Sequence, residues 1–113
     1  MRRIITAIAA LCLLSAPAMA QAYTGNWGCK ANGVKAGILT IYGNSYGFAS
    51  AVFGDPASGT GELTPYTDGV GFNNGALMEK GSVVAGRIVT DANAVTALQL
   101  ESATAIVMLC TPR

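Results

Sequence analysis

Histidine is absent from this 113-residue sequence, and charged residues make up only 12% of it. The chain therefore lacks the imidazole that commonly activates a serine or cysteine nucleophile, and it lacks a frequent zinc ligand. The six carboxylates are scattered through predicted turns and polar strand faces. General acid–base catalysis needs two titratable groups brought together, and spacing leaves only a glycosidase-type pair of Asp55 with Glu62 as an alternative. We expect a non-enzymatic protein without a metal or cofactor.

An apolar run long enough to cross a membrane is also lacking. Residues 1–20 instead have the pattern of a secretory signal, with Arg2 and Arg3 at the start, an apolar run over residues 4–16 and a small-x-small cleavage site that ends at Ala20. The run of about 13 residues is shorter than the roughly 20 that a membrane-spanning helix needs. We expect cleavage after Ala20, a single domain over residues 21–113, and a periplasmic or secreted protein that is not inserted in a membrane.

Basic residues are too few and too dispersed to form a patch. Removal of residues 1–20 leaves five of them against six acidic residues, which gives the mature chain a net charge of −1. Binding to nucleic acid or to an anionic membrane needs clustered Lys and Arg. We therefore expect neither partner. The five basic residues are Lys30, Lys35, Lys80, Arg87 and Arg113.

Cysteine is scarce, and one of the three cysteines, Cys12, lies inside the signal. Export to an oxidising compartment predicts that the remaining two, Cys29 and Cys110, form a disulfide. A loop of this length would stabilise the fold by on the order of 4 to 5 kcal/mol in the chain-entropy model. A free-thiol catalytic or metal role is disfavoured because no histidine accompanies the cysteines.

After residue 20, no segment of a dozen residues keeps a helical apolar stripe. Short runs of β-branched, aromatic and aliphatic residues alternate with turn residues, which is typical of strands. The segment 76–78 is uncertain, and 94–100 could instead form a short helix capped by Asp91. The predicted strands are 23–30, 37–42, 46–53, 61–66, 70–72, 82–89, 94–100 and 104–110.

These strands predict an all-β fold. Fourteen glycines suit a strongly curved sheet, and a disulfide between the first and last strands suits closure. We expect a small antiparallel up-and-down β-barrel of about eight strands, with a two-sheet β-sandwich as the alternative. Period-two alternation assigns the inward positions, with Trp27, the only tryptophan, as the core anchor. These positions are Tyr23, Gly25, Trp27 and Cys29; Leu39 and Ile41; Val70 and Phe72; Leu98 and Leu100; and Ile106, Met108 and Cys110.

The longest polar connection runs from Gly54 to Gly61 and is the candidate binding loop. Pro56 limits its backbone freedom, and its small side chains leave the main chain accessible. An ordinary hairpin connection is the alternative interpretation. Three tyrosines, Tyr42, Tyr46 and Tyr66, are candidates for exposed aromatic residues that stack on a sugar or a partner, or that pack across strands. The loop residues proposed for binding are Asp55, Ser58, Gly59, Thr60 and Gly61.

Two family resemblances rest on short motifs. The segment Gly25-Asn26-Trp27 resembles the Gly-x-Trp opening of lipocalin-type barrels, and this resemblance implies a cavity for a small apolar ligand. The chain is also similar to the periplasmic inhibitors of c-type lysozyme in its aromatic-x-Cys start at Trp27, its Ala57-Ser58-Gly59-Thr60-Gly61 loop, its Tyr66-Thr67-Asp68-Gly69 segment and its closing cysteine. That resemblance implies a serine-glycine loop that enters the lysozyme cleft. Asn73-Asn74-Gly75 stands where the family has a lysine.

Two functions remain open from the sequence. The first is a protein-binding module of the bacterial envelope, such as a hydrolase inhibitor, with an extracytoplasmic protein as its partner. The alternative is a carrier of small apolar ligands, which would need a cavity lined by Trp27, Phe48, Phe72 and Leu98. The sequence identifies neither the ligand nor the oligomeric state.

Overall fold

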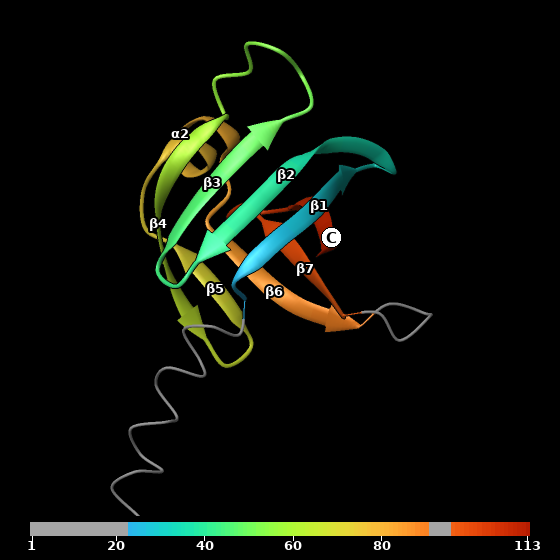
Figure 1. Cartoon of the computed structure of the whole chain (residues 1–113). Coiled ribbons are helices and arrows are strands. Elements are labelled where there is room, and N and C mark those ends of the chain that lie inside the picture. The colour runs from blue at the N-terminus through green and yellow to red at the C-terminus, as the bar shows by residue number, and fades with distance from the viewer. Residues whose placement is uncertain (1–22, 91–95) are drawn as a thin grey trace, which may run out of the picture.

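The computed structural model describes residues 23–90 and 96–113. In this part of the chain, eight strands and one short helix follow one another (Figure 1). The predicted signal over residues 1–20 lies outside the described residues. The elements are β1 (Gly25–Ala31), β2 (Val34–Tyr42), β3 (Ser45–Ser50), β4 (Gly59–Tyr66), β5 (Gly69–Phe72), α2 (Ala76–Gly81), β6 (Ala85–Thr90), β7 (Thr96–Glu101) and β8 (Ile106–Pro112).

The strands form a closed antiparallel barrel in sequence order. Each strand pairs with the next, and β8 returns to pair with β1 through four residue pairs, from Trp27 with Pro112 to Lys30 with Leu109. This confirms the predicted up-and-down barrel and not the sandwich. Residues 94–100 were predicted as a strand, with a short helix as the alternative. Residues 96–100 belong to strand β7, and residues 94 and 95 lie outside the described part of the chain.

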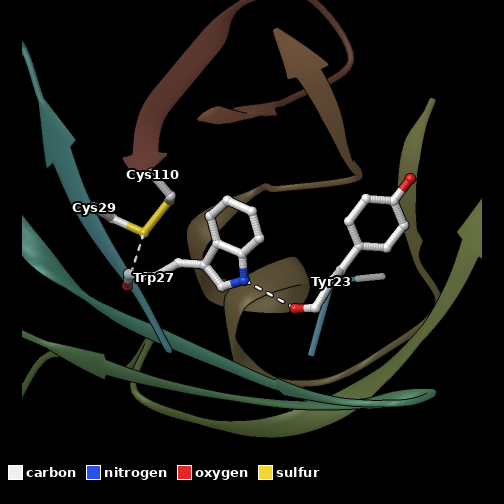
Figure 2. Close-up of a disulfide and its surroundings, with 4 residues drawn as sticks. All are labelled: Tyr23, Trp27, Cys29 and Cys110. Atoms are coloured by element: carbon white, nitrogen blue, oxygen red, sulfur yellow. Dashed lines mark hydrogen bonds between the residues drawn. A yellow bond between two sulfur atoms is a disulfide. The ribbon is translucent and has the colours of Figure 1, made fainter. Parts of the chain in front are cut away.

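The predicted disulfide closes this barrel. Cys29 and Cys110 are directly opposite in the β1–β8 register and are bonded across 81 residues of sequence. Figure 2 shows the Trp27 indole beside the bond. The indole is 6% exposed, and its N–H donates to the carbonyl of Tyr23 at 2.9 Å, so the ring is both buried and oriented. Trp27 therefore lies in the core, and its role as an anchor stays a prediction.

Inward-facing side chains from all eight strands and the helix fill the barrel. Among the described residues, no polar or charged side chain other than a tyrosine hydroxyl is buried, so the core is apolar. Tyr46 and Phe72 meet edge to face with ring centroids 5.0 Å apart. The largest fully buried side chains include Tyr46, Leu39, Ile41, Leu63, Leu77, Leu98, Leu100 and Val83.

Two inward assignments were wrong. Ile106 is 64% exposed, because β1 ends its pairing at Lys30 and an irregularity beside Glu101 shifts the β7–β8 register there. Gly25 is exposed at the start of β1, where its backbone has φ +134°. The other predicted inward residues are buried, except Met108, which is partly buried against the core.

The uncertain segment near residue 76 is a helix. Its sequence, ALMEKG, is rich in residues that favour helices. Ser82 ends it in the left-handed region, where its N–H donates to the Met78 carbonyl. Leu77 is fully buried and attaches the helix to the core. Within residues 23–90 and 96–113, no helix is both long and apolar enough to span a membrane.

Candidate binding loop

The connection between β3 and β4 projects from one end of the barrel (Figure 1). It covers residues 51–58, because β3 ends at Ser50 and β4 begins at Gly59. Phe53, predicted as the end of a strand, therefore belongs to the loop. Conversely, three of the proposed binding residues, Gly59, Thr60 and Gly61, belong to β4.

Asp55 fastens the base of this loop. Its carboxylate accepts a hydrogen bond from the Ala57 backbone N–H at 2.9 Å and another from the Ser50 hydroxyl at 2.7 Å. These two bonds, the backbone one first, lower the pKa of Asp55 below its ordinary value of 3.8 because they favour the charged form. The carboxylate is thus committed to the loop's own structure.

Ser58 contributes to the same base. Its Oγ accepts a hydrogen bond from the Ser50 backbone N–H at 3.0 Å, while its own N–H donates to the Asp55 carbonyl at 3.0 Å. The Ala51 N–H donates to Ala36 of β2 at 2.8 Å and so ties the other side of the loop to the sheet. Both ends of the connection are therefore held by hydrogen bonds.

The helix α2 packs against the base of the loop. Ala57 is the one loop residue that is buried, and a Cβ placed on Gly81 at the end of α2 would lie 3.7 Å from the Ala57 methyl. Gly59 is closer still to the helix, since a Cβ on it would lie 2.8 Å from the methyl of Ala76. The missing Cβ of Gly59 permits this close approach, and the loop base is packed as well as hydrogen-bonded.

The tip of the loop carries two apolar side chains in solvent. Phe53 is fully exposed and Val52 is 66% exposed. Sequence reasoning missed them because Ala51-Val52-Phe53 looks like the end of a strand. The signal that could have found them is the loss of alternation at three consecutive apolar residues immediately before Gly54-Asp55-Pro56.

The three candidate tyrosines differ in their exposure to solvent. The prediction that Tyr46 is exposed was wrong. Its side chain is 1% exposed and donates its hydroxyl proton to the Asn74 carbonyl at 2.9 Å. Burial raises its pKa. Tyr42 and Tyr66 are exposed, as predicted. The side chains that would line a carrier cavity, Trp27, Phe48, Phe72 and Leu98, are all buried in one hydrophobic cluster.

The two carboxylates of the glycosidase-type alternative, Asp55 and Glu62, have separate hydrogen-bond partners in the described part of the chain. Asp55 bonds within its loop, and Glu62 of β4 accepts from the Asn74 side-chain amide at 2.9 Å. Across residues 23–90 and 96–113, no three His, Cys, Asp or Glu side chains are grouped so that they could hold a metal ion.

No protein-family model, curated protein or solved structure matches this chain. The resemblances to lipocalins and to lysozyme inhibitors consequently rest on their short sequence motifs alone.

Proposed function

We propose that this protein is an exported, non-enzymatic binding module that recognises another extracytoplasmic protein through its β3–β4 loop. The observation that carries the proposal is the exposure of Phe53 and Val52 at the tip of a loop whose base is fixed. Two adjacent apolar side chains at a loop tip offer a compact apolar contact surface, and buried aromatic residues supply much of the energy of protein interfaces.

The fixed base makes recognition more favourable. Hydrogen bonds from Ser50, Ala57 and Ser58 hold the loop before any partner binds, so less conformational entropy is lost on association. The loop itself contains no basic residue, and its only charged side chain, Asp55, is already hydrogen-bonded at the base. The complementary surface is therefore an apolar pocket in a protein, with room for an aromatic ring.

A c-type lysozyme is the first specific target to test, because the similarity to its inhibitors includes this loop. In this protein, however, the Ser58 hydroxyl points to the loop base and Phe53 occupies the tip. We infer that Phe53, and not Ser58, makes the main contact with a partner. The carrier alternative has less support, since the side chains that would surround its ligand pack against one another.

Site-specific photocrosslinking tests the proposal. Phe53 is replaced by p-benzoylphenylalanine, and cells that export the protein are irradiated. We expect a discrete covalent adduct with one extracytoplasmic protein. The same replacement at Val34 is the matched control, because Val34 is also an exposed apolar residue beside a hairpin turn. An adduct from position 53 that is missing from position 34 supports the loop as the binding surface, whereas no adduct, or equal adducts, contradicts it.

A lysis assay with purified protein then tests lysozyme as the target separately from the general binding-module proposal. If lysozyme is the target, a molar excess should slow the lysis of cell walls by c-type lysozyme, and Phe53→Ser should abolish the effect without changing thermal stability. Val34→Ser, which changes another exposed apolar residue, is the control. Absence of inhibition by the folded protein rejects lysozyme as the target and leaves the crosslinking result to decide the binding-module proposal.

A further inference from the structure

A second surface feature lies away from the loop, on strands β4, β5, β6 and β7. Here the side chains and backbone surround an open hollow of about 500 Å³, which lies within the range of small-ligand sites. Asp68 and Gly69 of the β4–β5 turn line one side of this hollow. Figure 1 shows that this turn lies at the opposite end of the barrel from the β3–β4 loop. The lining of the hollow includes Tyr66, Asp68, Gly71, Arg87 and Glu101.

An aromatic ring over glycine forms one wall. Tyr66 is exposed, yet its ring lies against Gly71, where a Cβ would come within 3.1 Å of the Tyr66 Cε2 atom. Gly69 beside it has φ +152°, and a Cβ there would collide with the Gly86 carbonyl. These glycines let the Tyr66 ring and the β6 backbone pack closely against β5, and the part of the Tyr66 ring that stays exposed offers an apolar surface to a ligand.

The turn that carries Tyr66 is held in place from two sides. The Tyr23 hydroxyl, from inside the barrel, donates its proton to the Tyr66 carbonyl, and the Thr67 carbonyl lies 3.2 Å from the same hydroxyl. The Asp68 carbonyl accepts from the Ile88 N–H of β6 at 2.9 Å. Both sides of the turn are therefore ordered without a ligand, which is the condition for a preformed site.

Planar polar groups form the other wall. Arg87 Nη2 lies 3.4 Å from Glu101 Oε1, and the Gln99 amide donates to the other oxygen of Glu101 at 2.7 Å. Glu101 is thus oriented, whereas the Arg87 side chain is 65% exposed and, among the residues that the structure describes, uses one of its five N–H donors. Asp68 adds a second carboxylate to the lining. The hollow presents donors and acceptors together with an aromatic surface.

We propose that this hollow binds a neutral saccharide of one or two sugar rings. A sugar has an apolar C–H face that can stack on Tyr66, and its neighbouring hydroxyls both donate to carboxylates and accept from a guanidinium. A peptide strand is not favoured, because β5 is already paired on both sides by β4 and β6 and offers no free edge. The two carboxylates outnumber the one guanidinium, so an acidic sugar is also disfavoured.

Nuclear magnetic resonance of the ¹⁵N-labelled protein tests this site. Maltose, cellobiose and N,N′-diacetylchitobiose are added separately to about 20 mM, above the millimolar Kd expected of a small neutral ligand. At least one should shift the amide signals of Gly69, Gly71 and Arg87 in a saturable manner. Tyr66→Ala and Arg87→Ala should each weaken that binding by about tenfold.

Tyr42→Ala is the matched control, since Tyr42 is an exposed tyrosine on a different face of the barrel and its loss should leave binding unchanged. If Tyr66→Ala fails to fold, Arg87→Ala still tests the site. Arg87→Ala should stay folded, because an exposed ion pair contributes little to stability. The proposal is overturned if none of the three sugars shifts these signals, or if folded Tyr66→Ala and Arg87→Ala bind as the unmodified protein does. Crosslinking through Phe53 is independent of either result.

Discussion

Trp27 packs beside the disulfide with its indole N–H bonded to Tyr23 (Figure 2). Few other side chains in this small core bury as much apolar area, so Trp27→Ala should lower the free energy of unfolding by roughly 3 to 5 kcal/mol. Urea denaturation followed by circular dichroism measures the change. Tyr42→Ala, which removes an exposed ring, should have little effect. Water-like tryptophan emission from the native protein would contradict the burial on which this prediction depends.

The hydrogen bonds of Asp55 predict that the stability of the folded loop depends on pH. Its pKa in the folded protein is below 3.8, so the charged carboxylate stabilises the folded loop. This contribution is fully present above the ordinary pKa and is lost as the pH falls through the lower folded value. The Ala57 amide signal should therefore titrate with a midpoint below 3.8. In Asp55→Asn this titration should disappear, and Ala57 exchange should be faster at neutral pH. A midpoint at or above the ordinary value would show that these hydrogen bonds do not form in solution.

At the scale of elements, the barrel strands were predictable because their signal is local. Alternation of buried and exposed residues identified the inward pairs in β2, β5 and β7, and two cysteines left one pairing. The six-residue helix α2 gave no comparable signal, because it is too short for a helical stripe to repeat. Its existence depends on tertiary contacts, such as the burial of Leu77 and the hydrogen bond from Tyr46 to Asn74.

The candidate site was predictable only in part. The turn residues after Gly54 indicated a long connection, but local sequence does not show where a strand stops pairing. Ser50 ends β3 because its hydroxyl and backbone N–H bond to Asp55 and Ser58, residues five and eight positions later. Those bonds place Phe53 in solvent. Likewise, the closeness of Arg87 to Glu101 depends on the register of β6 against β7, which the sequence did not specify.

For the whole molecule, the disulfide should matter most at the β1–β8 seam. This pairing has only four residue pairs, whereas β2 and β3 share six. Replacing both Cys29 and Cys110 by alanine should cost on the order of 4 kcal/mol of stability. Hydrogen exchange should accelerate at the amides of β1 and β8 more than at those between β2 and β3. Equal acceleration in both regions, or none in either, would contradict a specific role of the bond at the seam.

The order of strands in the barrel also determines the order in which it can form. Seven of the eight pairings join strands that are neighbours in the chain, so each closes over a local connection, the longest of which is residues 73–84 between β5 and β6. The β1–β8 pairing joins residues 81 positions apart and carries the largest entropic cost. Hairpins should accordingly assemble first during refolding, and the two thiols should meet last. Oxidation then stabilises a barrel whose strands are already in register, and it does not direct their pairing.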